Sequence, residues 1–248
     1  MLAQQRSIDD IANNIANVNT DGYKRTRLDF RDALYDTMLS PAENGPGVNL
    51  QRGTGVLAYQ YIRDFALGAR KETGRTLDFS LDSRGFFAVE DISGQRLYTR
   101  SGAFYLSVEP AGEMLTDARG RYVLDQNGNR VTIRGEASEM TAAADGTLTF
   151  RMADGTFVTP GVRIGVYDFD NRAGLTDAGD GNFLPSANSG QARLSAAPEI
   201  RQGGLEASNV DFGYEATRLI RAQRAYQMSS RCVTVADQMA QLCNTIRN

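Results

Sequence analysis

The side chains that come closest to an enzymatic arrangement are two carboxylates, Asp78 and Asp82, which lie four residues apart in a strand-like segment. Paired carboxylates can cleave glycosidic bonds without histidine. The chain contains no histidine, which excludes a Ser-His-Asp triad, a Cys-His dyad and a His-based zinc site. Because alternate residues of a strand share a face, both carboxylates are expected to point to solvent. We therefore expect a non-enzymatic protein without catalytic residues, cofactor or metal, and keep an enzyme with paired carboxylates as an alternative.

The two cysteines of the chain, Cys232 and Cys243, lie eleven residues apart. On one helix their Cα atoms would be separated by roughly 16 Å, which is too far for an intramolecular disulfide. Both are expected to be small core residues.

Three asparagines, Asn13, Asn14 and Asn17, cluster near the N-terminus. On a packed helix their amides could fix the register between neighbouring helices through directional hydrogen bonds. Equally, the cluster could mark a transition from helix to loop.

Composition narrows the function further. Hydrophobic residues make up 41% of the 248-residue chain, enough for a packed core in one large domain or two small ones. The net charge is −3 with both signs intermixed, whereas a nucleic-acid site needs clustered positive charge. No apolar run is long enough to span a bilayer, and no N-terminal apolar segment marks a cleavable secretory signal. We expect no nucleic-acid partner and no transmembrane segment. If the protein leaves the cytoplasm, another machine must export it.

Residues 1–39 are expected to form a helical assembly segment. An apolar stripe at helical spacing runs along its first part: Ile8, Ile11, Ile15 and Val18. Since Asn and Gly tolerate the left-handed backbone conformation that ends helices, a C-cap is expected near Asn19 to Gly22. A second helix is expected over Arg27 to Leu39. Residues 40–75, with Gly and Pro at short intervals, are expected to be an extended linker.

Residues 76–204 have the pattern of an antiparallel β domain. Leu77, Phe79 and Leu81 alternate with polar residues, which indicates a half-buried strand. Turn signals such as Asn127-Gly128 and Asp145-Gly146 recur between short apolar runs, as in hairpins. No helix-length periodic segment interrupts them.

Residues 205–248 are expected to form one long helix, capped by Ser208 or Asn209. Two apolar stripes follow heptad-like spacing. Seam 1 consists of Leu219, Ala222, Tyr226, Ser229, Val233, Ala236, Ala240 and Cys243. Seam 2 consists of Ala225, Met228, Cys232, Val235, Met239, Leu242 and Ile246. At 100° per residue the two stripes are centred about 100° apart, so the helix needs partners on two sides.

The N-terminal helix can be one of these partners, and the other must come from another chain. The alternative is that the helix lies across its own β domain. The expected fold class is α+β, with an antiparallel β-rich central domain flanked by N- and C-terminal helices that pair as a coiled coil. The residues expected at subunit interfaces are Ile8, Ile11, Asn13, Asn14, Ile15, Asn17, Val18, Leu219, Ala222, Tyr226, Met228, Val233, Val235, Ala236, Met239, Leu242 and Ile246.

Several segments resemble those of a known family. The stretch Ala12-Asn-Asn-Ile-Ala-Asn-Val-Asn-Thr-Asp-Gly-Tyr-Lys24 closely resembles the N-terminal signature of bacterial flagellar rod and hook proteins. The stretch Leu205-Glu-Ala-Ser-Asn-Val-Asp211, followed by Gln223-Arg-Ala-Tyr226 and Asp237-Gln-Met239, is similar to the C-terminal signature. The β-domain segments with family resemblance are Leu77-Asp-Phe-Ser-Leu81, Gly85-Phe-Phe-Ala-Val89 and Tyr98-Thr-Arg-Ser-Gly102.

Within the family, the length of the chain and two segments favour a subunit of the distal rod. These segments are Phe30-Arg-Asp-Ala-Leu-Tyr35 and Gly53-Thr-Gly-Val56. A proximal rod or hook subunit is the alternative inside the family, and a soluble coiled-coil adaptor is the alternative outside it.

The resemblance implies a structural subunit of the flagellar basal body, exported unfolded by the flagellar type III export apparatus without a cleaved signal peptide. Its terminal helices are then expected to pack into the inner tube and its β domain to form an outer layer. The implied partners are copies of itself, other rod and hook subunits, the export apparatus and the surrounding basal-body rings. Family members usually have further residues before the position of Ala3, so a short and a truncated N-terminus are both open.

Overall fold

The computed structural model describes residues 1–38, 50–53, 55–109, 112–133, 137–152, 156–159 and 161–247. The chain divides into two compact units. Unit 1 consists of residues 1–16, 26–63 and 211–248, and unit 2 of residues 17–25 and 64–210. Each unit is therefore assembled from segments that are far apart in the sequence.

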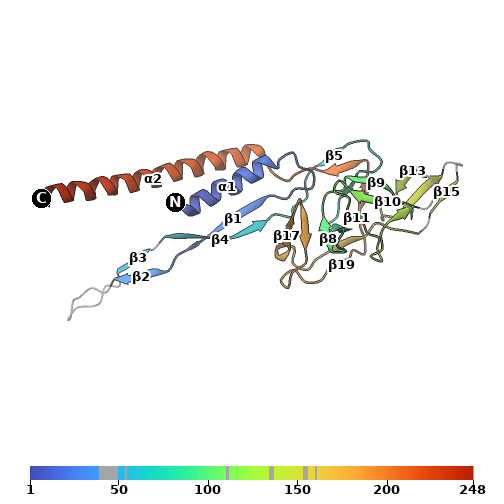
Figure 1. Cartoon of the computed structure of the whole chain (residues 1–248), viewed down its shortest axis with the longest axis horizontal. Coiled ribbons are helices and arrows are strands. Elements are labelled where there is room, and N and C mark those ends of the chain that lie inside the picture. The colour runs from blue at the N-terminus through green and yellow to red at the C-terminus, as the bar shows by residue number, and fades with distance from the viewer. Residues whose placement is uncertain are drawn as a thin grey trace. The chain divides into compact units, whose positions relative to one another are not determined.

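Unit 1 contains two helices and a two-stranded ribbon (Figure 1). The helices are α1 (Leu2–Ala16) and α2 (Phe212–Arg247). In the ribbon, β1 (Thr26–Asp32) pairs antiparallel with β4 (Val56–Arg63). Further along, β2 (Tyr35–Met38) pairs antiparallel with β3 (Leu50–Gly53).

The helix expected over Arg27 to Leu39 is wrong, because β1 and β2 cover its described part. In β1, Leu28 and Phe30 alternate with charged side chains, which is the period of a strand. Leu39 and residues 40–49 and 54 of the expected linker lie outside the described residues. Most of the remaining linker residues belong to strands or lie between them.

Unit 2 holds the other strands and one short 3-10 helix. Their bounds are β5 (Arg70–Glu72), β6 (Phe79–Leu81), β7 (Phe86–Glu90), β8 (Arg96–Thr99), β9 (Phe104–Glu109), β10 (Gly112–Asp117), β11 (Tyr122–Val123), β12 (Thr132–Ile133), β13 (Ala137–Ala142), β14 (Leu148–Met152), β15 (Phe157–Val158), β16 (Val166–Asp168), η1 (Arg172–Gly174), β17 (Thr176–Gly179), β18 (Asn182–Leu184), β19 (Arg193–Leu194), β20 (Ile200–Gln202) and β21 (Gly204–Glu206).

The largest sheet of unit 2 has the strand order β12-β10-β11-β7-β8-β18-β17, with β9 on β10, β16 on β7 and β19 on β16. A smaller sheet joins β13, β14 and β15, and two pairs, β6–β20 and β5–β21, bring the end of the unit back to its beginning. All these pairings are antiparallel. The expected α+β class is confirmed, with a β-rich central domain between an N-terminal and a C-terminal helix.

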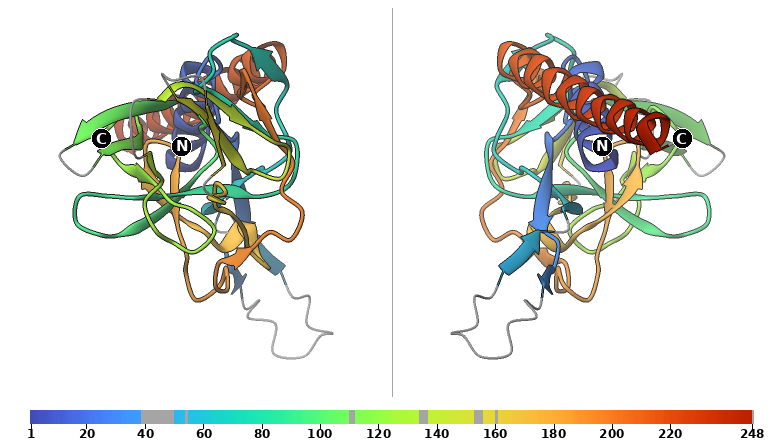
Figure 2. Two further views of the ribbon diagram at one scale, coloured as in Figure 1. Left: turned by 90° about the vertical axis from the view of Figure 1, so that its right-hand side faces the viewer. Right: turned by 90° about the vertical axis from the view of Figure 1, so that its left-hand side faces the viewer.

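The strands of unit 2 enclose two clusters of buried apolar side chains, and the left view of Figure 2 shows the strands of this unit from one end. The larger cluster includes Phe79, Phe87, Phe104, Leu115, Leu148 and Ile164. A second cluster is mainly aromatic, with Phe86 and Phe183 edge to face at 5.5 Å between ring centroids. Such edge-to-face pairs add to the stabilisation that burial alone provides.

The two carboxylates considered for catalysis differ from their expected position. Asp78 is buried and accepts a hydrogen bond from Thr73 Oγ1 at 2.7 Å, while Asp82 is half-buried and ion-paired to Arg201 at 2.5 Å. Asp78 therefore does not point to solvent as expected. All three residues of β6 are buried, so the alternation of apolar and polar residues there does not mean that the polar side chains face solvent.

Both helix ends near the signatures also differ from expectation. Helix α1 ends at Ala16, before the expected C-cap, so Val18 lies outside the helix. Gly22 does take a left-handed conformation, with φ +74°. Helix α2 begins at Phe212, and its cap is Asp211, whose Oδ1 accepts the amide of Tyr214 at 3.1 Å. The expected caps Ser208 and Asn209 precede it and bond elsewhere.

Candidate assembly interface

Helix α2 is much longer than its partner in unit 1. The two helices run side by side in opposite directions, and α2 continues beyond the N-terminus of α1 (Figure 1). At 1.5 Å per residue, the 15 residues of α1 span about 22 Å and the 36 residues of α2 about 54 Å. More than half of α2 therefore extends past the helix that lies beside it.

Seam 1 is the side of α2 that is covered within the chain. Ala222 is buried, and Leu219, Tyr226 and Ser229 are half-buried. From Val233 onward, the described members of seam 1 are exposed. Seam 1 thus has an intramolecular partner only over its first part.

Seam 2 has no such cover. Ala225 is half-buried, but every later member is exposed: Met228, Cys232, Val235, Met239, Leu242 and Ile246. From Met228 to Ile246 this apolar stripe is about 27 Å long at helical rise. A contiguous apolar stripe of this kind on a folded protein marks an interaction site. The right-hand view of Figure 2 shows α2 (orange to red) running to the C-terminal end of the chain.

The expectation that Cys232 and Cys243 are core residues is wrong, because both are exposed, and both are free thiols. Cys243 is a member of seam 1 and Cys232 of seam 2, so both are part of the exposed apolar stripes of α2 and not of a core. The absence of a disulfide between them agrees with their spacing.

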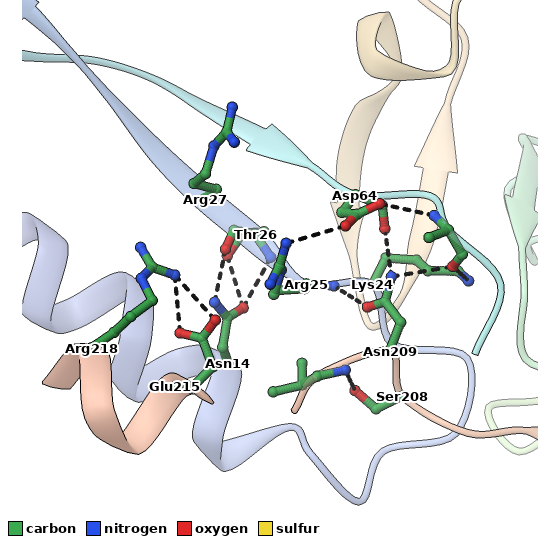
Figure 3. Close-up of polar contacts among 12 residues, drawn as sticks. Asn14, Lys24, Arg25, Thr26, Arg27, Asp64, Ser208, Asn209, Glu215 and Arg218 are labelled. Atoms are coloured by element: carbon green, nitrogen blue, oxygen red, sulfur yellow. Dashed lines mark hydrogen bonds and ion pairs between the residues drawn. The ribbon is translucent and has the colours of Figure 1, made fainter. Parts of the chain in front are cut away.

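The polar side of α1 holds the beginning of β1. Asn14 is fully buried, and its side chain donates to the carbonyl of Thr26 at 2.7 Å and accepts from the amide of Thr26 at 2.9 Å (Figure 3). Asp10 accepts the hydroxyl of Thr26 at 2.6 Å and the amide of Leu28 at 3.3 Å. These bonds are made in addition to the pairing of β1 with β4, and they attach the beginning of the ribbon to α1.

The residues expected at subunit interfaces therefore fall into three groups. Those buried within the chain are Ile11, Asn14 and Ala222. Those half-buried are Ile8, Ile15, Asn17, Val18, Leu219 and Tyr226. Those exposed are Asn13, Met228, Val233, Val235, Ala236, Met239, Leu242 and Ile246. The last group is the part of the set that a neighbouring subunit can reach.

A second polar centre lies inside unit 2, where Lys24, Arg100 and Glu206 meet. Lys24 Nζ lies 2.5 Å from Glu206 Oε1, and Arg100 Nε lies 2.8 Å from Glu206 Oε2. Burial lowers the pKa of Lys24 although Glu206 opposes that shift. Burial alone would raise the pKa of Glu206, but the charges of Arg100 and Lys24 outweigh it and hold the pKa below its usual 4.5. The carboxylate is thus ionised at neutral pH.

Further hydrogen bonds, made by the main chain and by the side chain of Asn209, join the same segments. The amide of Gly22 donates to the carbonyl of Glu206 at 2.6 Å, and the amide of Arg25 donates to Asn209 Oδ1 at 2.7 Å. Asn209 Nδ2 in turn donates to the carbonyl of Asp64 at 2.8 Å (Figure 3). A Cβ atom added at Gly68 would lie 2.0 Å from the carbonyl oxygen of Ala207, so the segments approach too closely for any side chain there.

Sequence reasoning did not single out this charged centre, although a signal was present. Lys24, Arg100 and Glu206 each lie in one of the segments that resemble the flagellar family. That these three residues lie in family-like segments could have suggested that they contact one another, whereas their spacing along the sequence could not.

In the part of the chain that the structure describes, no helix is long and apolar enough to cross a membrane. Within the same residues, no three Asp, Glu or Cys side chains are grouped so that they could hold a metal ion.

Comparison with known proteins decides the family. Residues 1–24 match the family model "Flagella basal body rod protein", residues 80–150 match "Flagellar hook protein FlgE/F/G D1 domain", and residues 201–246 match "Flagellar basal body rod FlgEFG protein C-terminal". The flagellar basal-body rod protein FlgG of Caulobacter vibrioides is 37% identical over 260 residues, covering 100% of this chain and 96% of that protein. The chain belongs to the flagellar basal-body rod protein family.

Two further relatives show the breadth of this rod family. FlgG of Agrobacterium fabrum is 36% identical, covering 98% of this chain and 94% of that protein. The flagellar hook-basal body complex protein FlhP of Bacillus subtilis is 32% identical, with coverage of 98% and 94%. The resemblance found in the signatures is therefore confirmed over nearly the whole length, and the chain is a structural subunit of the rod type.

Two of the segments that match the rod family meet at the polar centre. The N-terminal match ends at Lys24, and the C-terminal match begins just before Glu206. The two signatures that identify the family are thus bonded to each other in the folded chain.

Proposed function

We propose that this chain polymerises into the helical tube of the flagellar rod, in its distal part, by packing the exposed half of α2 against helices of neighbouring copies. The observation that carries the proposal is seam 2, whose members from Met228 to Ile246 are all exposed. Every described side chain from Arg231 to Ile246 is likewise exposed. An apolar stripe of this length gains most when a second helix covers it.

The pairing of α1 and α2 is proposed to become a coiled coil in the tube, where neighbours extend it over both seams. Because the stripe is unprotected in a single subunit, ordering of the terminal segments and binding would be coupled. The remaining partners are other rod and hook subunits and the surrounding rings. Delivery by the flagellar type III export apparatus, without a cleaved signal peptide, places the protein in the basal body. A catalytic role has no part in this proposal.

The direct test is to image purified protein under assembly conditions by electron microscopy. Helical tubes support the proposal. Persistent monomers with an ordered α2 contradict it, and a discrete oligomer whose size is independent of concentration favours a soluble coiled-coil adaptor.

A matched pair of variants tests the role of α2. Val233→Asp places a charge in seam 1 beyond α1 and should abolish assembly while the β domain stays folded, because a charge buried between helices has no partner. Gln238→Asp places the same charge on the polar side of α2 and should assemble normally. Loss of the β fold in Val233→Asp would show instead that α2 packs on its own domain.

The similarity to FlhP supports a second candidate, another position within the hook-basal body. Cells that lack the chain distinguish the two. A distal subunit predicts basal bodies whose rods stop short of the hook, whereas a proximal subunit predicts basal bodies without a rod.

A further inference from the structure

Three charged side chains meet in the interior of unit 2, and they come from widely separated parts of the chain. Glu206 lies 182 residues after Lys24 and 106 residues after Arg100. Each of the three side chains is at most 3% exposed. Two cations share one anion, so the cluster carries one excess positive charge.

The other hydrogen-bond acceptors of the two cations are neutral carbonyl groups. Lys24 Nζ donates to the carbonyl of Ala66 at 2.6 Å, and Arg100 Nη1 donates to the carbonyl of Ser83 at 3.0 Å and to that of Gly85. Carbonyl groups satisfy hydrogen bonds but do not neutralise charge. In the part of the chain that the structure describes, the ion pairs of both cations go to Glu206.

Lys24 and Arg100 can therefore be buried at low free-energy cost only when Glu206 docks between them. Two like charges taken out of water without a counter-ion are strongly unfavourable, and removing one partner of a buried pair destabilises far more than breaking a surface pair. Before the C-terminal signature docks, both cations are more stable in water.

We infer that Glu206 is a latch that closes unit 2, so that segments 17–25 and 64–69 settle on the β domain only after the C-terminal signature has docked. When the N-terminal signature and the β domain are present without a docked C-terminal signature, these two segments therefore remain undocked. Unit 2 can therefore complete its folding only when the chain up to residue 206 is available to dock. This inference concerns folding, and it stands whether or not the chain assembles as proposed above.

One hydrogen bond near the latch serves as its reporter because it does not involve Glu206. The amide of Asp64 donates to the carbonyl of Arg25 at 2.8 Å. If the latch holds these segments, loss of the Glu206 charge must expose the Asp64 amide. The amide of Val131, which donates to the carbonyl of Val123 at 2.9 Å in the central sheet, is the internal reference.

The test is hydrogen exchange on the full-length protein with Glu206→Gln, which keeps the shape of the side chain and removes its charge. Exchange at the Asp64 amide should rise at least about a hundredfold, while the Val131 amide stays protected. The matched control is Glu199→Gln, on an exposed side chain of the same unit, which should leave both amides as in the wild type. An Asp64 amide that stays protected in Glu206→Gln overturns the inference.

A double variant keeps the test decisive if Glu206→Gln unfolds unit 2 altogether. Once the anion is gone, Lys24 is an unpaired buried cation, so adding Lys24→Met should restore protection by about tenfold or more. Additive losses in the double variant would overturn the latch, because they would show that the two side chains act independently. In pulse-labelled refolding of the wild type, Asp64 should become protected together with Ala207, whose amide bonds the carbonyl of Ala69. Earlier protection of Asp64 contradicts the inferred order.

Discussion

The two units of the chain are stabilised in different ways. Unit 2 encloses a large apolar cluster that includes Phe79, Phe87 and Phe104. In the described part of unit 1, the buried apolar side chains are Ile11, Leu28 and Ala222, and the other buried ones are polar or charged. Since burial of apolar surface is the main favourable term in folding, unit 2 gains most of its stability from its own core, whereas unit 1 gains much less from burial.

The largest expected effect tests the independence of unit 2. Phe87→Ala removes a fully buried ring from the centre of the core and should lower the unfolding free energy of unit 2 by about 3 to 5 kcal/mol. The control Val108→Ala, on an exposed side chain of β9, should change it little. Thermal and denaturant unfolding of both variants measures the difference. Equal stability of the two variants would show that unit 2 does not depend on this core.

The next effect concerns the charged centre of unit 2. Because the folded-state pKa of Glu206 lies below 4.5, its charge stabilises unit 2 fully above pH 4.5, and this contribution is lost as the pH falls through the folded-state pKa. Glu206→Gln should therefore be less stable than the wild type at neutral pH, and the gap should narrow below pH 4.5. Denaturant unfolding at several pH values measures it. If the difference in unfolding free energy between the two proteins did not change with pH, the charge of Glu206 would not be the cause of the lost stability.

A smaller effect is expected in unit 1. Asn14→Ala leaves the amide and carbonyl of Thr26 without their side-chain partner and should weaken the attachment of the ribbon by about 1 to 3 kcal/mol. Hydrogen exchange at Thr26 measures this loss, and the melting of unit 2 should not change. Gln5→Ala, on an exposed side chain of α1, is the control. A parallel loss of stability in unit 2 would contradict the division into separately stabilised units.

The smallest effect concerns the start of α2. Asp211→Ala removes the side-chain acceptor of the Tyr214 amide and should weaken the first turn by about 1 kcal/mol. Exchange at the Tyr214 amide should accelerate, whereas Asp237→Ala, on an exposed side chain in the middle of α2, should leave that amide unchanged. If both variants behave alike, Asp211 does not cap the helix.

What the sequence predicts correctly in this chain is local periodicity. The β zone follows from turn signals and short apolar runs, and the long C-terminal helix follows from the 3-4 spacing of residues such as Leu219 and Met239. Both patterns depend on neighbours within one or two turns of the chain, so they can be seen without the fold.

The failures depend on partners that are distant in sequence. Strand β1 lies within a range predicted as helix, because its strand-like alternation covers only Leu28 and Phe30 and its partner β4 begins only at Val56. Ser208 and Asn209 were reasonable caps by type, but Asn209 is used to bond Arg25 and Asp64. The charged centre joins residues up to 182 positions apart. The spacing of these residues along the sequence gives no signal for such a pair, and only their places in the family-like segments do.

The bond between the Asp64 amide and the Arg25 carbonyl has a consequence for how this architecture can vary. It joins Arg25 and Asp64, the two residues of unit 2 that flank segment 26–63, so the chain leaves unit 2 and returns to it at neighbouring residues. In topological terms the ribbon is an insertion. Its length could grow or shrink by duplication and deletion while the β domain, and the meeting of the two signatures within it, stayed as it is.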